Sequence, residues 1–186
     1  MNDESHGSSW NRETLTDAAS TRLPIFLPVL AILIGILLFQ NLRTSESEEF
    51  VGKQFDYDSA SSTGESINKE ALLGSVVVVN FWATHCPPCL EDINHLKELL
   101  EELRHDDFRI VGINLNRQEN LDEFFQFRES LPWPSLYGSD AVSLGEMYKV
   151  SKIPRVMLLD RKGTIVADAR GIDDIKAHVL RLVHGG

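Results

Sequence analysis

The chain contains two cysteines, Cys86 and Cys89, with prolines at both positions between them. A disulfide between residues this close would close too short a loop to stabilise a fold appreciably. The pair lies between a β-branched run and an amphipathic pattern, so Cys86 is expected at or just before a helix N-terminus, where the dipole and free amides stabilise a thiolate. Because the offset of three brings Cys89 onto the same face, the pattern predicts a redox-active dithiol.

Two other interpretations of the cysteine pair are open. Half of a zinc site would need a second Cys or His pair, and no C-x-x-C partner or H-x-x-x-H motif follows the cysteines. A buried, inert pair is disfavoured because Pro87 and Pro88 force a turn at the surface. A catalytic dithiol is therefore favoured, and the sequence predicts neither a metal site nor a cofactor.

The elements that position the pair come from the hydrophobic patterns after residue 50. Apolar runs and alternations predict strands at 54–58, 65–67, 76–81, 108–115, 155–159 and 164–169. Apolar residues at helical spacing predict helices at 93–103, from 121 to a point before Pro132, at 142–148 and at 172–182. This order indicates an α/β fold with a central mixed β-sheet flanked by helices and an N-terminal β-hairpin.

An uncharged segment, residues 23–42, is bounded by Arg22 and Arg43. At about 1.5 Å per residue, a helix of this length spans the roughly 30 Å hydrocarbon core of a bilayer. A buried core helix would show a polar face, and a cleaved signal peptide would have a shorter apolar region with an A-x-A-like site. The flanking charges are balanced and do not set an orientation. We expect a disordered polar tail at 1–22, a transmembrane anchor at 23–42, a linker at 43–49 and a folded domain at 50–186.

The charge balance of the chain is acidic. It has 18 Lys and Arg against 28 Asp and Glu, which gives a formal charge of −10. Sequence-independent binding of nucleic acid needs clustered cations, so nucleic acid is disfavoured as a partner. Proteins or small molecules are the expected partners.

The segment from Val79 to Cys89, VNFWATHCPPC, resembles the active-site signature of thioredoxin-like proteins. More narrowly, the chain resembles the membrane-anchored TlpA-like thiol-disulfide oxidoreductases of the ResA and CcmG type. The similarity covers about residues 50–183 and includes LPWP at 131–134 and YKVSKIPRVMLLD at 148–160. The resemblance implies a thioredoxin-like fold and activity on the disulfides of other proteins. It also implies a single-pass protein of the bacterial inner membrane, with its catalytic domain on the periplasmic, extracytoplasmic side.

The resemblance implies roles for individual residues. Cys86 is the attacking thiolate, and Cys89 is the resolving thiol that releases the mixed disulfide. Pro154 matches the family's cis-proline, which would hold the Ile153 backbone open for pairing with a substrate strand. The alternative is that Pro154 simply starts a strand. Trp82 would form an apolar wall beside the dithiol. The expected substrate-binding residues are Trp82, His85, Pro87, Pro88, Ile153 and Pro154.

Two features next to Cys86 act on the pKa of its thiol with opposite sign. A protonated His85 imidazole would lower this pKa and make the disulfide more oxidising. Pro87 and Pro88 each remove an amide that could solvate the thiolate, which raises the pKa and favours reducing power. The direction of the redox reaction is therefore not fixed by these residues. An alternative for His85 is a solvent-exposed side chain without a role.

Asn80 stands six residues before Cys86, where cytosolic thioredoxins place a buried acid that shuttles the proton of the resolving thiol. An amide cannot do this, so another group must. In ResA-like relatives the candidate is a Glu three residues after the second cysteine, and Asp92 occupies that position here. A partly buried carboxyl there would have a raised pKa suited to acid–base catalysis. The alternative is that Asp92 only stabilises the first turn of the helix. Thr84 is expected to be a backbone spacer.

Together these features predict an anchored extracytoplasmic oxidoreductase that reduces disulfides in client proteins, such as an apocytochrome c before haem attachment. A membrane thiol carrier, implied by the family, would supply the electrons. Two alternatives remain: a disulfide oxidase or isomerase of the same fold, and a metallochaperone that binds Cu(I) with its thiols and a His. For copper, only His178 and His184 lie far enough along the chain, in the terminal helix, which is a poor place to meet Cys86.

Overall fold

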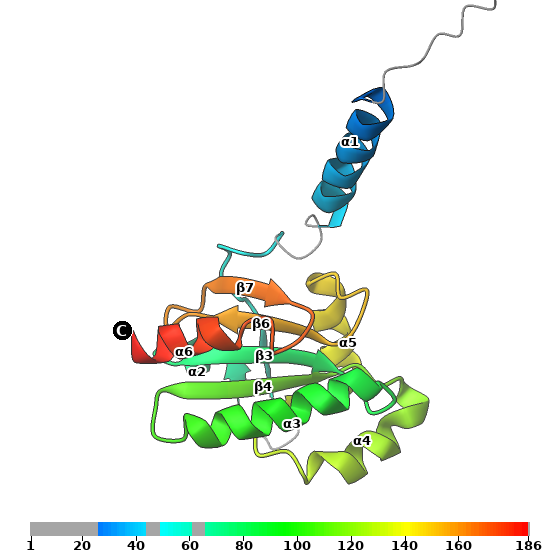
Figure 1. Cartoon of the computed structure of the whole chain (residues 1–186). Coiled ribbons are helices and arrows are strands. Elements are labelled where there is room, and N and C mark those ends of the chain that lie inside the picture. The colour runs from blue at the N-terminus through cyan, green and yellow to red at the C-terminus, as the bar shows by residue number, and fades with distance from the viewer. Residues whose placement is uncertain (1–25, 44–48, 61–65, 186) are drawn as a thin grey trace, which may run out of the picture. The chain divides into compact units, whose positions relative to one another are not determined.

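The computed structural model describes residues 26–43, 49–60 and 66–185 of the chain. The chain divides into one unit that ends at Leu42 and a second unit that extends from Arg43 to Gly186. Helix α1 (Phe26–Arg43) lies almost entirely in the first unit, and all other elements belong to the second (Figure 1). The tail predicted at 1–22 and most of the predicted linker lie outside the described residues.

Helix α1 overlaps the segment predicted to cross a membrane, of which residues 23–25 are outside the described part. Among the residues that the structure describes, no helix is long and apolar enough to span a bilayer. The anchor at 23–42 is therefore not confirmed and stays a prediction from the sequence.

A five-stranded mixed sheet forms the centre of the second unit, in the order β5-β4-β3-β6-β7. Its middle strand, β3 (Val76–Trp82), is parallel to β4 (Phe108–Asn114) and antiparallel to β6 (Arg155–Leu159). The edge strands are β5 (Ser135–Leu136), which is parallel to β4, and β7 (Ile165–Ala169), which is antiparallel to β6. The predicted α/β fold with a central mixed sheet is thus confirmed.

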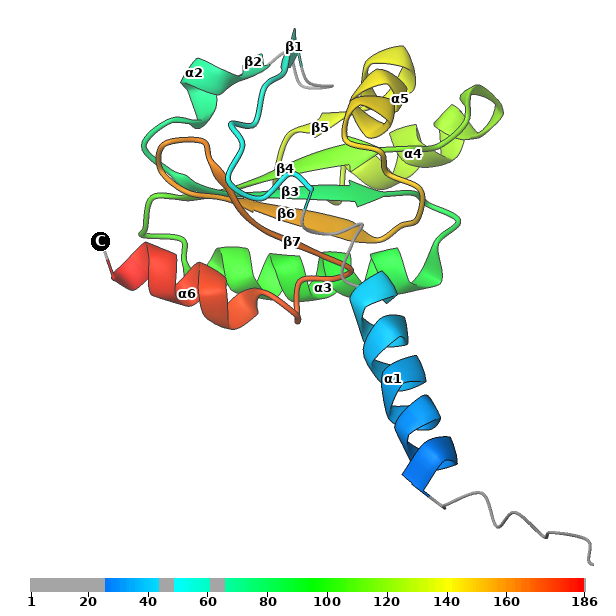
Figure 2. The same cartoon turned by 90° about the horizontal axis from the view of Figure 1, so that it is seen from above.

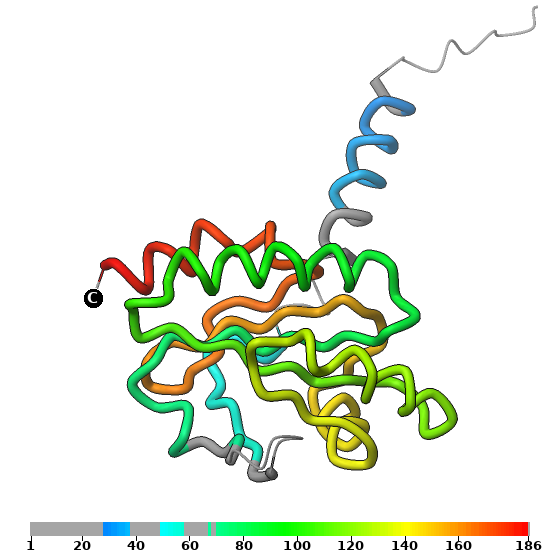
Figure 3. The backbone as a smooth tube through the Cα atoms, turned by 90° about the horizontal axis from the view of Figure 1, so that it is seen from below, coloured from blue at the N-terminus to red at the C-terminus, as the bar shows by residue number. Residues whose placement is uncertain are grey.

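Helices cover both faces of the sheet (Figure 2). On one face, α3 (Pro87–Glu102) and α6 (Lys176–His184) run side by side (Figure 3). The opposite face carries α5 (Gly138–Met147) and the short α2 (Lys69–Leu72). The cysteine-containing helix therefore lies directly on the central sheet.

The remaining elements are short. A 3-10 turn, η1 (Gln118–Asn120), leads into α4 (Leu121–Arg128) after β4. The predicted N-terminal hairpin consists of β1 (Asp58–Ala60) and β2 (Ser66–Asn68), which pair antiparallel. These elements complete the second unit in the described part of the chain.

Strand β3 separates two apolar cores. All of its residues are buried, as predicted for a strand covered on both faces. Because successive side chains of a strand point to opposite faces, Val76, Val78 and Trp82 enter the cluster under α3 and α6, and the intervening apolar side chains enter the cluster under α5. The strand is thus held from both sides of the sheet.

The structure differs from the predicted elements mainly where segments are short. The patterns do not predict β5, α2 or η1, because two to four residues are too few to show a period. The first hairpin is shifted along the chain, since β1 begins at Asp58, where its predicted strand ends. Gln54, expected in that strand, instead forms a single bridge with Thr164, and residues 61–65 of the turn lie outside the described part.

Tyr148 fixes the beginning of the second unit against the end of α5. Its ring stacks on Phe55 at 5.0 Å between centroids, and Phe50 meets it edge-on at 5.1 Å. The Asp56 N–H donates a hydrogen bond to the Tyr148 hydroxyl at 2.9 Å. The segment entering the domain is therefore attached next to Lys149 and the loop that follows it.

Candidate active site

The predicted dithiol is present as a disulfide at the junction of β3 and α3. The two sulfurs are 2.05 Å apart, and the Cα atoms are 5.2 Å apart. Cys86 caps the helix in an extended conformation, and Pro87 and Pro88 occupy its first two positions. The N–H groups of Cys89 and Leu90 donate to the Cys86 carbonyl at 3.0 and 3.2 Å. The prolines therefore remove two of the amide donors that a helix N-terminus normally offers to a thiolate.

The two cysteines differ in access to solvent. Cys86 is 8% exposed, whereas Cys89 is completely buried. Exchange with another protein requires an approach to one sulfur of the pair, and only Cys86 allows it. This difference supports the predicted order, in which Cys86 attacks and Cys89 resolves.

The residues around Cys86 divide into an exposed and a buried set. His85 and both prolines of the motif are exposed. Trp82 is fully buried and packs against Phe124 and Phe127, at 6.1 and 5.3 Å between ring centroids. It belongs to the same apolar cluster as both cysteines. Trp82 therefore lines the dithiol from the core, as the predicted wall, and does not lie on the surface that a client would touch.

The Ile153–Pro154 peptide lies at the same end of the sheet as the disulfide. Its peptide bond is cis, as predicted. Phe81 of β3 pairs with Arg155, the first residue of β6, so Pro154 is level with the end of β3 that leads to the cysteines. Ile153 packs against the cluster that contains them, and within the described residues its backbone N–H and C=O have no backbone partner. These groups are available to an extended client segment.

Asp92 is buried on α3, one turn after Cys89. It is 8% exposed, and its Oδ2 atom has no hydrogen-bond partner in the described part of the chain. The Ile172 N–H donates to the carboxylate, and Gly171 lies so close that a Cβ there would be 3.0 and 3.2 Å from its two oxygens. Burial raises the pKa of Asp92 to about 6, and the nearby charges of Asp173 and Asp174 act in the same direction.

The position of Asp92 argues against one of its two interpretations. No acidic residue lies in the first turn of α3, so stabilisation of the helix start does not explain it. Residues three apart on a helix share a face, which places Asp92 beside Cys89. A carboxyl with a pKa near neutrality in this position can accept and return the proton of the buried thiol.

Asn80 is completely buried on the face of β3 that α3 covers. Neither of its amide atoms has a hydrogen-bond partner among the described residues. As an amide it carries no charge and exchanges no proton at neutral pH. Asp92 is therefore the buried acid of this site.

A side-chain network that the sequence analysis did not identify holds the loop before Cys86. Asn116, just after β4, is 1% exposed; its Oδ1 accepts the Thr84 N–H at 2.9 Å, and its Nδ2 donates to the Thr84 hydroxyl at 2.6 Å. That hydroxyl donates to Glu123 at 2.8 Å, and Asn116 also contacts Asn114 and Asn120. Thr84 is thus more than a backbone spacer. The pair of asparagines that ends a buried strand is the signal in the sequence that could have indicated this network.

The histidines considered for copper lie on α6, toward the far end of α3. Lys176, the first residue of α6, is 3.8 Å from Glu102, the last residue of α3, and His184 is 3.8 Å from Asp106. Cys86 lies at the opposite end of α3. Within the described ranges, no group of three or more His, Cys, Asp or Glu side chains is arranged to hold a metal ion.

The chain is similar to known thiol-disulfide oxidoreductases. A family model described as thioredoxin-like matches residues 74–165. The thiol-disulfide oxidoreductase ResA of Halalkalibacterium halodurans is 28% identical over 141 residues, covering 75% of this chain and 80% of that protein. The thioredoxin-like protein YneN of Bacillus subtilis is 29% identical over 148 residues, covering 72% of this chain and 85% of that protein.

Solved structures share the fold. A thiol:disulfide interchange protein described as a putative DsbE, from Chlorobium tepidum, superposes with a TM-score of 0.62 at 20% identity, covering 72% of this chain and 97% of that one. The thioredoxin domain of a thiol-disulfide oxidoreductase from Bacteroides vulgatus gives a TM-score of 0.61 at 23% identity, covering 72% and 98%. These likenesses confirm the predicted thioredoxin-like fold.

Replacing Asp92 with Asn is expected to stabilise the oxidised protein at pH 7 by ~2 kcal/mol. The folded protein holds this pKa at about 6 against an ordinary 3.8, so the carboxyl destabilises the fold increasingly as the pH rises through that interval, and fully above it. Urea unfolding between about pH 3.5 and 8 measures the effect. Asp122→Asn, at an exposed position, is the control. An unchanged pH dependence in Asp92→Asn would show that burial does not raise this pKa.

Replacing Asn116 with Ala is expected to destabilise the protein by about 2 kcal/mol, because it leaves the Thr84 N–H and the Asn114 amide without their buried partner. Denaturant unfolding of the oxidised protein measures the loss. Asn94→Ala, on the exposed side of α3, should stay within about 0.5 kcal/mol of the original chain. Equal effects of the two substitutions would contradict the role given to the network.

The site and the comparisons lead to one assignment. A disulfide with one accessible sulfur stands at a helix N-terminus, with a cis-proline at the same end of the sheet and a buried acid one turn away. The matching family model covers the strand, the cysteines and the cis-proline. The chain is a thioredoxin-like thiol-disulfide oxidoreductase, similar to the ResA proteins.

Proposed function

We propose that the protein reduces disulfides in client proteins outside the cytoplasm and is itself reduced by a membrane thiol carrier. The observation that carries the reducing direction is the start of α3, where both residues after Cys86 are prolines without an N–H. A thiolate with fewer donors is less stable, so the reduced dithiol gives up its electrons more readily. His85 is exposed, with no hydrogen bond or ion pair in the described part of the chain that would orient it toward the sulfur.

The proposed reaction begins with the reduced dithiol. The Cys86 thiolate attacks one sulfur of the client disulfide, forms a mixed disulfide and releases the first client thiolate. Asp92 accepts the proton of the Cys89 thiol, and the resulting Cys89 thiolate attacks the Cys86 sulfur. The second client thiolate then leaves, and the proton held by Asp92 passes to it. The first client thiolate takes from solvent the proton that Cys86 released when it ionised, so the client gains two electrons and two protons in all. The enzyme ends as the disulfide seen in the structure.

The proposed location is the periplasmic side of a bacterial inner membrane, with residues 23–42 as a single anchor. It is supported by the uncharged run in the sequence and by the similarity to ResA proteins. An apocytochrome c is the proposed client class. Labelling of the reduced cysteines in intact cells with a membrane-impermeant maleimide tests the location, since labelling only after lysis would place the dithiol inside.

The reduction potential tests the direction. We expect a value near about −270 mV or lower against glutathione and dithiothreitol, and a value near about −120 mV would make the protein a disulfide donor. The double substitution Pro87→Ala and Pro88→Ala restores two amide donors and should shift the potential to a less negative value. His85→Trp is the matched control and should change the potential by less than about 30 mV. A larger shift from His85→Trp than from the proline variant would assign control of the potential to the imidazole.

Trapping tests the roles of the two cysteines. Cys89→Ser leaves Cys86 able to attack but removes the resolving thiol, so a stable mixed disulfide with a client should accumulate. Cys86→Ser should form none, because Cys89 is completely buried. Both variants are incubated with an oxidised peptide that carries the haem-attachment cysteines of an apocytochrome c and are analysed by mass spectrometry. Adducts on Cys89 in the Cys86→Ser variant would contradict the assignment.

A further inference from the structure

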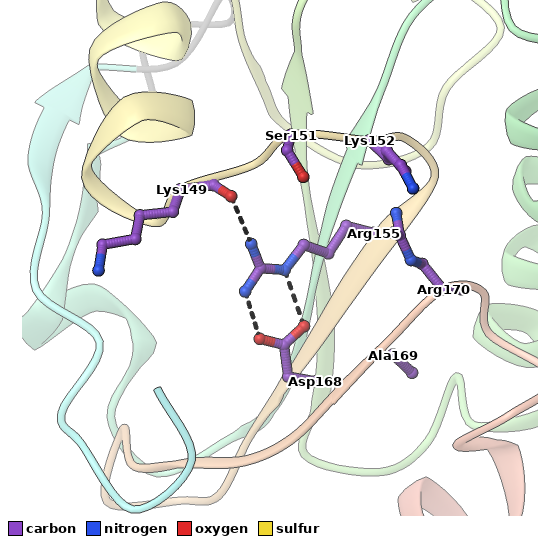
Figure 4. A pocket seen from close by; sticks show the side chains of 7 residues that line it. All are labelled: Lys149, Ser151, Lys152, Arg155, Asp168, Ala169 and Arg170. Atoms are coloured by element: carbon purple, nitrogen blue, oxygen red, sulfur yellow. Dashed lines mark hydrogen bonds and ion pairs between the residues drawn. The ribbon is translucent and has the colours of Figure 1, made fainter. Parts of the chain in front are cut away.

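A shallow cleft, open to solvent, is lined by residues on both sides of the Ile153–Pro154 peptide. Figure 4 shows the side chains that line it. Four of them are cations, namely Lys149, Lys152, Arg155 and Arg170, and the only acid among the lining residues is Asp168. This concentration of positive charge stands out in a chain whose formal charge is −10.

Arg155 forms the fixed inner part of the cleft. Its Nε and Nη2 atoms donate to the two oxygens of Asp168 at 2.8 and 2.5 Å, and its Nη1 donates to the carbonyls of Tyr148 and Lys149 at 2.7 and 3.2 Å. The side chains of Arg155 and Asp168 are 9% and 1% exposed. Asp168 therefore neutralises Arg155 and is not available to the other cations.

Lys152 and Arg170 carry the uncompensated charge of the cleft. Both are exposed, and in the described part of the chain neither has a hydrogen-bond or ion-pair partner, whereas Lys149 pairs with Glu49 at 2.5 Å. In Figure 4 the ends of the Lys152 and Arg170 side chains point toward one another. Like charges that face one another repel, and an anion between them would remove the repulsion.

The two cations flank the groups that a client would meet. Lys152 directly precedes Ile153, whose backbone N–H and C=O are free of backbone partners in the described residues. Arg170 directly follows β7 and precedes Gly171, which touches the Asp92 carboxylate. An extended segment bound along Ile153 advances about 3.3 Å per residue, so residues close to its reactive cysteine lie over the cleft.

We propose that the Lys152–Arg170 cleft binds an acidic side chain, Asp or Glu, of the client segment next to the disulfide being reduced. This proposal rests on the proposed function and adds to it a substrate preference. The cleft lies beside the backbone of Ile153, where a client segment would bind, so we expect the anion to be a side chain of that peptide. The chain as a whole is acidic and repels an acidic client, whereas the cleft attracts it.

The test compares two disulfide peptides that differ only in having Glu or Lys at positions within four residues of the reactive cysteine. The full chain, purified in detergent and reduced, should react with the Glu peptides about tenfold faster than with the Lys peptides at low salt. The double variant Lys152→Glu and Arg170→Glu should reverse this preference. High salt should remove it in both proteins, because the interaction is between exposed charges.

Controls separate the cleft from net charge and from folding. Arg104→Glu with Lys162→Glu makes the same change in net charge at exposed positions outside the lining of the cleft and should keep the preference for Glu peptides. The uncharged disulfide of oxidised 2-mercaptoethanol should react equally with all three proteins. This reaction shows that the dithiol is intact in each variant.

The outcomes distinguish the two proposals. If the original chain reduces neither peptide although it reduces the small disulfide, the proposed function itself fails. Reduction of both peptides at equal rates by the original chain and by the Lys152→Glu/Arg170→Glu variant would leave the function standing and overturn the docking site. If the two peptides react at equal rates and the original chain, but not the Lys152→Glu/Arg170→Glu variant, binds vesicles of anionic lipid, the cleft binds lipid headgroups instead. This outcome also overturns the proposal.

Discussion

The position of β3 in the middle of the sheet is the constraint on which the site depends. The strand is bonded to β4 on one side and to β6 on the other, and apolar clusters pack against both of its faces. A shift by one residue would exchange the two faces and move Asn80 from one core to the other, so the register is strongly fixed. Cys86 follows four residues after the strand ends, and the contact between Thr84 and Asn116 fixes the intervening loop to the end of β4. Because β6 is paired in register with the same strand, Pro154 is positioned by the same hydrogen bonds.

Among the described residues, Asp92 is the only acidic residue that is buried as a whole. A carboxylate at position 80 would add a second negative charge to the face that α3 covers, and two such groups raise each other's pKa. With a neutral amide there, position 80 adds no charge that would act on the pKa of Asp92. Its environment is built by two separate parts of the chain. Helix α3 supplies the carboxyl and its neighbour Cys89, and the segment after β7 supplies Gly171 and the Ile172 N–H. The pKa of about 6 therefore reflects tertiary packing as much as the type of residue.

The sequence predicts those features of the fold that have a long period or a local motif. The buried strands at β3, β4 and β6 and the amphipathic helix after the cysteines extend over enough residues to show their pattern, and the C-P-P-C motif specifies its own position at a helix start. The cis bond before Pro154 and the position of Asp92 came from a family resemblance, and the structure confirms the bond and shows the acid to be buried. The Asn116 network and the Lys152–Arg170 cleft could not be predicted, because their members are far apart in the sequence. The network forms only when the end of β4 meets the β3–α3 loop. The cleft forms only when the residues before β6 meet those at the end of β7.

The contact of Gly171 with Asp92 has a consequence for the protein before it is folded. The two cysteines and Asp92 are close in sequence and emerge together during synthesis, but Gly171 and Ile172 follow about eighty residues later. Until β7 and the segment after it have docked, the carboxyl is solvated and titrates like any other aspartate, so it is a poor proton acceptor for a thiol. A nascent or damaged chain therefore has the two cysteines without the buried carboxyl to which the proposed function gives the proton transfer. With that role for Asp92, the complete exchange reaction requires the last part of the domain to be in place, and immature copies would scramble disulfides less readily.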